Sequence, residues 1–193
     1  MEIKNLILEL NEFVCKETCQ KIIDWFWDNK DIHTMGKVYG GEDSSNKNNV
    51  LNLDRKNTIQ AYPHPDDPIS NVLSEIIFSG YAKYKELLPT PQGQPLCATT
   101  YSVRIYQRGV GKFLEHVDQS AGPNVTRVFG IILYLNNVEE GGETHFPDYQ
   151  LDVNPEQGKL LIFPCNYLFK HQGNIPISDD KYIFTAFINY SDV

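Results

Sequence analysis

The stretch KFLEHVD, residues 112–118, decides the expected fold of this chain. Its residues favour an extended strand, in which side chains two positions apart point to the same side of the sheet. His116 and Asp118 can therefore both reach one metal ion. A further histidine, His171, follows 55 residues later (171 − 116). Only a sheet that closes on itself would bring His171 back to the first two side chains.

These three residue types indicate a particular metal chemistry. Two histidines and one carboxylate can occupy one face of an octahedral Fe(II) ion, and the other positions stay open for a co-substrate and dioxygen. Lys181 comes ten residues after His171 (181 − 171), about the length of a turn and a return strand. Its ammonium group would supply a cation for a bound dicarboxylate. Each piece alone is common by chance, but together, on separate strands and in this order, they predict an oxygenase.

The second half of the sequence alternates with period two and is broken by short turns, which is typical of strands. The predicted strands are 98–107, 112–118, 127–136, 144–147, 159–164, 168–172 and 181–190. Strands at this spacing without intervening helices indicate a sandwich or jelly roll. The expected fold class is therefore α+β, mainly β.

The first half carries the predicted helices. Residues 3–10 are predicted to form a short strand, and residues 16–29 an amphipathic helix with Cys19, Ile22, Ile23 and Phe26 on one face. A second helix is predicted from about 69 to 88, packed across the outside of the sheet. A chain of 193 residues suffices for one domain with a substantial core. We expect a single domain over 1–193, with helical support in 1–97 and the β core in 98–193.

The segment 34–58 differs from its surroundings because its centre is polar and has no period. It is predicted to be a long mobile loop. Long loops in compact domains are often lids or binding segments. A tolerated disordered insertion fits the sequence equally well, so both interpretations stay open. Residues 89–95 are predicted to form a linker within the domain.

Composition bounds the function. The net charge of −8 argues against a nucleic-acid partner, because phosphate binding requires a basic surface. Glu2, Glu9 and Glu12 exclude a signal peptide, and no apolar run reaches transmembrane length. Four cysteines in a chain of this length do not demand disulfides. We expect a cytoplasmic protein without a membrane partner, in a reducing setting that would keep iron ferrous.

Residues 106–190 resemble the catalytic core of the prolyl 4-hydroxylase group of Fe(II)/2-oxoglutarate dioxygenases. The resemblance covers nearly half the chain without a large gap, and the N-terminal half resembles the helical support of that family more loosely. The matching pieces are Tyr106 with Gly109, HVD at 116–118, LYLN at 133–136, EGGET at 140–144, FP at 146–147, PEQG at 155–158, LIFP at 161–164, HQG at 171–173 and Lys181.

The resemblance implies a double-stranded β-helix (jelly roll) with iron at its open mouth. It implies oxidative decarboxylation of 2-oxoglutarate to succinate and CO2, coupled to hydroxylation of a C–H bond by O2. It also makes ascorbate a candidate reductant. The residues carried over are His116, Asp118 and His171 as catalytic Fe(II) ligands, Lys181 as the partner of the 2-oxoglutarate C5 carboxylate, and Tyr106, Tyr134 and Thr185 as further co-substrate contacts.

The expected substrate is a peptidyl proline, in a proline-containing peptide or protein. Phe113 departs from the family, because many members have a tyrosine near that position. The alternatives are a 2-oxoglutarate oxygenase that acts on a free amino acid, another small metabolite or an alkylated base, and a non-catalytic jelly-roll binding module. The acidity of the chain argues against the base, and the intact set of ligands argues against the binding module. The sequence leaves the oligomeric state open.

Overall fold

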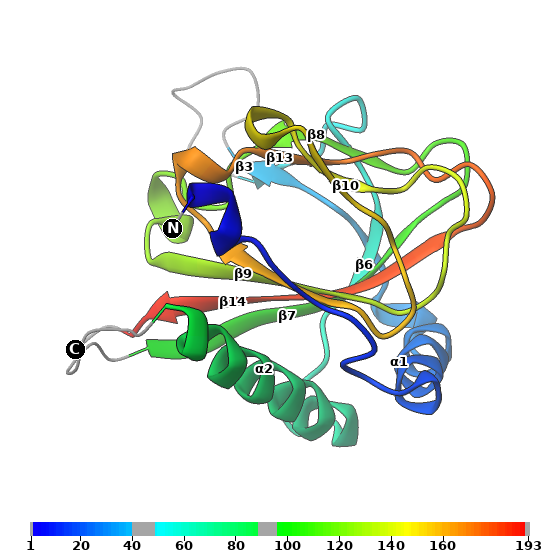
Figure 1. Ribbon diagram of the computed structural model, residues 1–193. Helices are drawn as coiled ribbons and strands as arrows, with labels where there is room; N and C mark the ends of the chain where they lie inside the picture. The colour runs from blue at the N-terminus through cyan, green and yellow to red at the C-terminus, as the bar shows by residue number, and fades with distance from the viewer. Residues whose placement is uncertain (1, 40–48, 89–95, 192–193) are drawn as a thin grey trace.

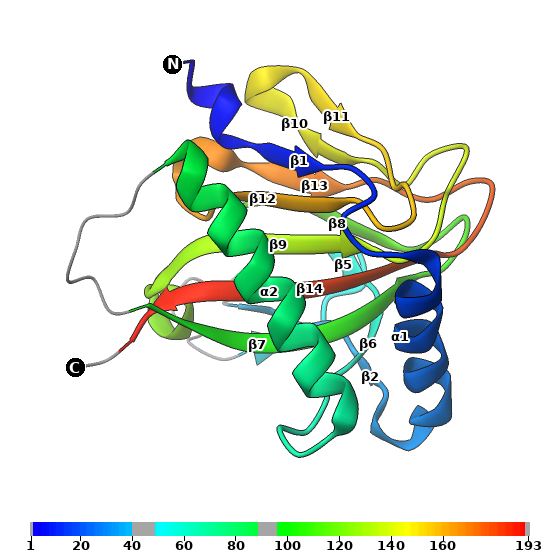
Figure 2. The same cartoon turned by 60° about the horizontal axis from the view of Figure 1, so that its bottom comes forward.

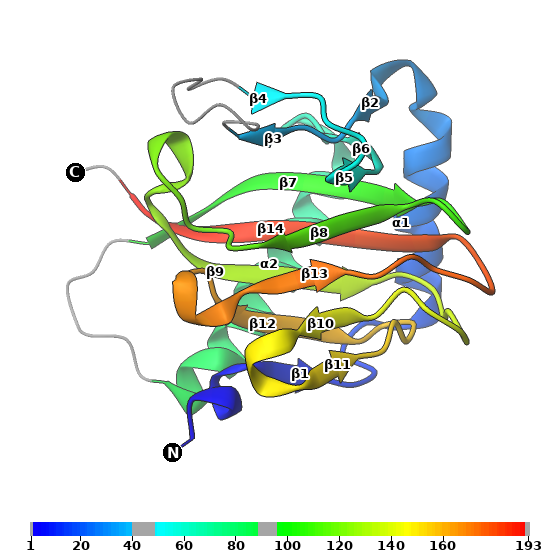
Figure 3. The same cartoon turned by 90° about the horizontal axis from the view of Figure 1, so that it is seen from above.

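The structure is a computed structural model, and it describes residues 2–39, 49–88 and 96–191. Two antiparallel sheets lie face to face (Figures 1 and 3). The larger sheet has the order β1 (Leu8–Leu10), β12 (Leu160–Pro164), β9 (Arg127–Tyr134), β14 (Lys181–Tyr190), β7 (Leu96–Tyr106), β6 (Ile59–Ala61) and β2 (Thr34–Met35). The smaller sheet has the order β11 (Leu151–Val153), β10 (Thr144–Phe146), β13 (His171–Gly173), β8 (Lys112–His116) and β5 (Lys56–Asn57).

This architecture confirms the predicted double-stranded β-helix of an α+β, mainly β chain. The central strand of the larger sheet is β14, which pairs antiparallel with both β7 and β9. Its sequence KYIFTAFINY is buried at nearly every position. A strand that is covered on both faces needs such a continuous apolar run rather than strict alternation. One face of β14 can therefore pack on the helices while the other looks into the space between the sheets.

Two helices cover the outer face of the larger sheet (Figure 2). The first, α1 (Lys16–Asp28), buries Cys19, Ile22 and Phe26 at helical spacing. The second, α2 (Pro68–Leu87), starts with a proline at a position where the missing N–H costs nothing. Gly80 lets α2 approach the sheet closely, because a Cβ there would lie 2.4 Å from the Leu160 side chain. Both helices were predicted within one residue at each end, and α2 packs across the outside of the sheet as predicted.

Five short 3-10 helices complete the described elements: η1 (Ile3–Leu6), η2 (Lys30–Ile32), η3 (Gly122–Asn124), η4 (Pro147–Tyr149) and η5 (Tyr167–Phe169). Two of them stand where the sequence predicted strand. The predicted strand 3–10 begins as η1 and is extended only in β1. The predicted strand 168–172 begins in η5, because the Asn166 side chain accepts a hydrogen bond from the backbone N–H of Leu168 and starts a turn.

The prediction of one long loop over 34–58 is wrong for its described parts. They contain β2, β5 and the two-stranded ribbon of β3 (Val38–Tyr39) with β4 (Asn49–Val50). These strands are two residues long, and β2 and β5 pair with strands far along the chain, so local periodicity does not reveal them. The strands β6 and β11 were missed because each has only three residues, too few to show a period. Residues 40–48 and the predicted linker 89–95 lie outside the described residues.

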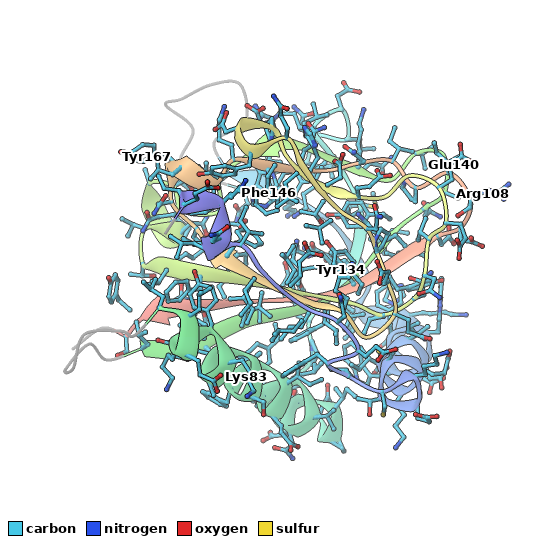
Figure 4. The ribbon with its side chains drawn as sticks, in the orientation of Figure 1. Lys83, Arg108, Tyr134, Glu140, Phe146 and Tyr167 are labelled. Atoms are coloured by element: carbon cyan, nitrogen blue, oxygen red, sulfur yellow. The ribbon has the colours of Figure 1, made fainter. Side chains whose placement is uncertain are left out.

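Apolar side chains form two layers of core. One lies between the helices and the larger sheet, and the other lies between the two sheets around Phe146 and Phe163. Figure 4 shows Tyr134 and Phe146 on the inside, with Lys83 and Arg108 on the outside. All four cysteines are free thiols. Within the ranges that the structure describes, no helix has both the length and the apolar character needed to cross a bilayer.

Candidate metal centre

The three predicted metal ligands converge at one end of the smaller sheet. β8 and β13 pair so that His116 stands opposite His171. The Nε2 atoms of His116 and His171 each lie 3.6 Å from a different carboxylate oxygen of Asp118. Among the described residues, these three form the one group of histidine, cysteine and acidic side chains whose ligand atoms all lie within 4.8 Å of one another.

The local backbone differs from the predicted strand 112–118. β8 ends at His116, so Asp118 lies two residues beyond it, where the chain bends toward β9. Arg127 holds this bend by donating from Nη1 to the backbone carbonyl of Asp118, at 3.2 Å. Gly130 on β9 leaves room for the carboxylate, because a Cβ there would lie 3.1 Å from Asp118 Oδ2. The ligand pair is therefore fixed by tertiary contacts and not by strand alternation alone.

Backbone carbonyls orient both imidazoles. His116 Nδ1 lies 2.8 Å from the carbonyl oxygen of Leu114, and His171 Nδ1 lies 3.1 Å from that of Phe169. A carbonyl oxygen can only accept, so both Nδ1 atoms carry the proton. The lone pair is then on Nε2, the atom that faces Asp118 in each case. This is the usual outer-shell arrangement of a metal-binding histidine.

The charge states also suit a cation. Burial and the neighbouring His116 lower the pKa of His171 to about 4, so its ring is neutral at physiological pH. Burial raises the pKa of Asp118, but His171, His116 and Arg127 outweigh it. The net effect of these three neighbours is to hold the pKa of Asp118 below its usual range. Neutral imidazoles and an ionised carboxylate are the forms that bind a divalent metal.

Aromatic rings hold the histidines from outside. The Phe113 ring stacks on His116, with centroids 3.5 Å apart and planes at 20°. Phe163 meets His171 edge to face, with centroids 4.7 Å apart. The Phe113 ring thus covers one ligand with a flat apolar surface. Both contacts limit rotation of the imidazoles.

A narrow pocket of about 30 Å³ adjoins the three ligands on the side of the larger sheet, and Lys181 is part of its wall. The Lys181 side chain is 1% exposed, and its Nζ donates to the carbonyl oxygen of Gly142 at 2.7 Å. The same ammonium group lies 4.0 Å from the centre of the Tyr106 ring. Burial lowers the pKa of Lys181 to about 7, although Glu143 opposes the shift. A carboxylate that entered this pocket would find a desolvated cation with no carboxylate bonded to it among the described residues.

Of the other predicted co-substrate residues, two line the narrow pocket and one does not. Tyr106 and Thr185 line the pocket together with Lys181. The hydroxyls of Thr185 and Ser102 share a hydrogen bond of 2.9 Å. Tyr134 is not part of the wall, and its hydroxyl donates instead to Thr144 Oγ1 at 2.7 Å. Since Thr144 does line the pocket, Tyr134 can act there only through its neighbour.

A much larger cavity, of about 850 Å³, borders two of the three ligands, His116 and Asp118. It lies under β2 to β6 and the adjoining ends of β7, β9 and β14. Five residues line both cavities and so mark their junction: Arg104, Phe113, His116, Asp118 and Phe187. The candidate metal site therefore stands between a narrow buried pocket and a wide chamber.

Sequence reasoning missed the cations of this chamber, among them Lys56, Arg104 and Arg127. Arg104 precedes Tyr106 by two positions on β7, so the period of a strand could have placed it on the same face. Lys56 offered no such signal, because it stands in the polar segment that was expected to be a loop. Its position follows only from the pairing of β5 with β8.

Comparisons with known proteins agree with this geometry. Residues 101–189 match the family model of the 2OG-Fe(II) oxygenase superfamily. No curated protein matches this sequence.

Similar solved structures include three prolyl hydroxylases. A viral collagen prolyl hydroxylase from Paramecium bursaria Chlorella virus-1, in a 2OG complex, has a TM-score of 0.69 and 19% identity, over 96% of this chain and 97% of that one. A prolyl hydroxylase from Trichoplax adhaerens, in complex with a peptide fragment of the hypoxia inducible factor oxygen degradation domain, has a TM-score of 0.73 and 15% identity, over 96% of this chain and 84% of that one. A Pseudomonas putida prolyl-4-hydroxylase has a TM-score of 0.68 and 13% identity, over 95% of this chain and 92% of that one. At such identities the likeness establishes the shared fold.

Proposed function

We propose that this chain, whose residues 101–189 match the family model of the 2OG-Fe(II) oxygenase superfamily, is a 2-oxoglutarate-dependent dioxygenase that hydroxylates a prolyl residue in a peptide or protein. Its cofactor is Fe(II), and 2-oxoglutarate and O2 are its co-substrates. The observation that carries the proposal is the position of the three candidate ligands between a narrow pocket that contains Lys181 and a chamber of about 850 Å³.

The residues divide the work as follows. His116, Asp118 and His171 would hold Fe(II), which would activate O2, the oxidant that couples decarboxylation of 2-oxoglutarate to hydroxylation. Lys181 binds the far carboxylate of 2-oxoglutarate by a charge-assisted hydrogen bond. Tyr106 and Thr185 contact the same molecule. The apolar rings of Phe113 and Phe163 keep the ligands in place and exclude water from their outer side.

The chamber is the place for the substrate. It borders His116 and Asp118 directly, and its volume is within the range of known ligand sites. Structures with this fold include prolyl hydroxylases, and one of them holds a peptide. The described parts of 34–58 form one wall of the chamber, and closure of this segment over a substrate stays a prediction. We further propose that 1–193 is a single dioxygenase domain and that the protein works in the cytoplasm without nucleic acid.

The first test is direct. Protein supplied with Fe(II), 2-oxoglutarate and ascorbate is expected to form succinate and to add one oxygen atom to a peptide that contains proline. Mass spectrometry of the peptide and succinate quantification should show equal amounts of the two products. The same peptide with alanine in place of proline is the control. Succinate that forms while no proline peptide gains oxygen would contradict the proline assignment and favour a small-metabolite substrate.

Two tyrosine variants compare a residue of the pocket wall, Tyr106, with one that lies behind the wall, Tyr134. Tyr106→Phe should weaken 2-oxoglutarate binding by about two- to tenfold, because one neutral hydrogen bond contributes about 0.5–1.5 kcal/mol. Tyr134→Phe should lower the free energy of unfolding by about 1 kcal/mol, because it leaves the Thr144 hydroxyl without its donor. Tyr134→Phe should weaken 2-oxoglutarate binding less than Tyr106→Phe does. Calorimetric titration and urea unfolding of both variants measure this contrast, and equal effects on binding would refute it.

A further inference from the structure

The chamber is cationic although the chain as a whole carries a net charge of −8. The basic residues among its described lining are Lys37, Arg55, Lys56, Arg104 and Arg127. Asp118 is the one acidic residue in that lining, and its carboxylate is turned toward the two histidines. An acidic protein that gathers cations around one cavity creates a local field that attracts anions.

Two of these cations are buried deeply. Lys56 is 5% exposed and Arg104 is 9% exposed. Burial of a charge is costly unless a partner compensates it. No salt bridge joins either side chain to a carboxylate in the described parts of the chain. Arg104 Nε donates to the Ser102 hydroxyl at 2.9 Å, and the Lys56 ammonium lies 4.6 Å from the centre of the Phe113 ring.

These contacts leave both charges short of an anion. A neutral hydroxyl and an aromatic face stabilise a cation far less than a carboxylate does. Burial first, and then the charges of Arg104 and Arg127, lower the pKa of Lys56 well below its usual value, while Asp118 opposes them. A negative group placed among these side chains would remove that repulsion.

The cations are also close to the reacting centre. The Lys56 ammonium lies over one face of the Phe113 ring, and the same ring stacks on His116. Arg104 borders both the chamber and the narrow pocket. An anion held by the two side chains would therefore be one aromatic ring away from a candidate metal ligand.

Gln60 supplies an independent sign that a polar ligand binds here. It stands opposite Arg104 in the register of β6 with β7, it lines the chamber, and it is buried. Its amide nitrogen donates to the Tyr62 hydroxyl at 2.5 Å, while its amide oxygen has no partner. Turning the amide over would leave the nitrogen unpartnered instead. A buried polar atom without a partner usually has a ligand or water to complete it.

We propose that the substrate of this enzyme carries a carboxylate close to the carbon that is hydroxylated, and that Lys56 and Arg104 bind this carboxylate and so determine specificity. The inference rests on the proposed function, because it concerns the substrate of the same site. Two sources have this chemistry: an acidic side chain next to the target proline of a peptide, and the α-carboxylate of a free amino acid.

The experiment compares matched ligands on the complete protein loaded with Mn(II) and 2-oxoglutarate, so that binding is measured without turnover. In the first arm, labelled peptides with blocked ends carry one proline flanked either by glutamate or by its neutral isostere glutamine. Fluorescence anisotropy gives both dissociation constants. In the second arm, free L-proline is compared with L-prolinamide by calorimetry. The acidic member of one pair is expected to bind about tenfold or more tightly, as a charge-assisted hydrogen bond predicts.

The variants assign that preference to residues. Lys56→Met and Arg104→Met should reduce the ratio of the two constants toward one, whereas Lys56→Arg should keep it. The ratio of the two dissociation constants is the proper readout, because damage to the fold weakens the binding of both ligands of a pair alike. Lys83→Met, on the exposed face of α2, is the matched control and should change neither constant.

The outcomes separate cleanly. A preference in the peptide arm supports an acidic peptide, and a preference in the second arm alone supports a free amino acid. No preference in either arm, or a preference that survives both methionine variants, overturns the proposal. So does a loss of 2-oxoglutarate affinity in Arg104→Met with the preference intact, because Arg104 would then serve the co-substrate. Binding of acidic peptides without hydroxylation would instead refute only the proline assignment.

Discussion

Replacement of Asp118 by alanine is expected to abolish tight binding of Fe(II) or Mn(II). Asp118 is the only anionic member of the candidate ligand set, and its two oxygens each approach one imidazole nitrogen at 3.6 Å. Loss of an outer-shell partner alone costs about 10- to 100-fold in metal affinity. Loss of the charged ligand itself should therefore exceed about 100-fold, and succinate formation should fall with it. Mn(II) titration followed by electron paramagnetic resonance measures the affinity directly.

A matched control exists on the surface. Asp152 pairs with His145 at 2.7 Å outside the site, so Asp152→Ala also removes a carboxylate from a histidine. It should leave metal affinity unchanged. An Asp118→Ala protein that is folded by circular dichroism and still binds Mn(II) as wild type does would show that the metal is held elsewhere.

Replacement of Lys181 by methionine is expected to weaken 2-oxoglutarate binding by about two to four decades. Removal of one partner of a buried charge pair costs about 3–5 kcal/mol, because the other charge stays buried and unpaired. Metal affinity should change little, since Lys181 belongs to the other sheet. Lys159→Met removes a second buried lysine, one that pairs with Glu9 and Glu156, and it should leave 2-oxoglutarate affinity intact. Equal losses of metal and 2-oxoglutarate affinity in Lys181→Met would indicate misfolding and remove the support for its role.

The same lysine predicts a pH dependence. Burial holds the pKa of free Lys181 near 7, so part of the population is neutral at weakly alkaline pH. A bound carboxylate favours the charged form and raises this pKa, and binding must then take up a proton. 2-Oxoglutarate affinity should therefore be highest below about pH 7 and decline as the pH rises above it. Calorimetry at about pH 8 in two buffers of different ionisation enthalpy should show the proton uptake, and Lys181→Met should show none.

Long periodic segments could be predicted from the sequence, and contacts between distant strands could not. Both helices and β14 were predicted because each carries ten or more residues of one consistent pattern. The two- and three-residue strands β2, β5, β6 and β11 have too few residues to show a period. The pairing of β2, β5 and β6 is decided by partners elsewhere in the chain, which is a tertiary effect, whereas β11 pairs with β10, the strand just before it.

The candidate site shows the same division. The residues His116, Asp118, His171 and Lys181 could be singled out because their spacing and order imply one chemistry. The bend that carries Asp118 past the end of β8 depends on Arg127 and Gly130, and neither residue has a signature of that role. The placement of Lys56 beside Phe113 likewise depends on sheet register. The sequence thus predicts the candidate metal ligands better than it predicts which substrate the chamber binds.

The two anchors of the site stand on different sheets. His116 and His171 belong to the five-stranded sheet, whereas Lys181 begins the central strand of the seven-stranded one. Under the proposed function, a dicarboxylate bound to both the iron and Lys181 would act as a removable cross-link between the two halves of the β-helix. Ligands that bind only the folded state stabilise it by mass action. Iron and 2-oxoglutarate would then contribute to the stability of the folded enzyme as well as to its rate.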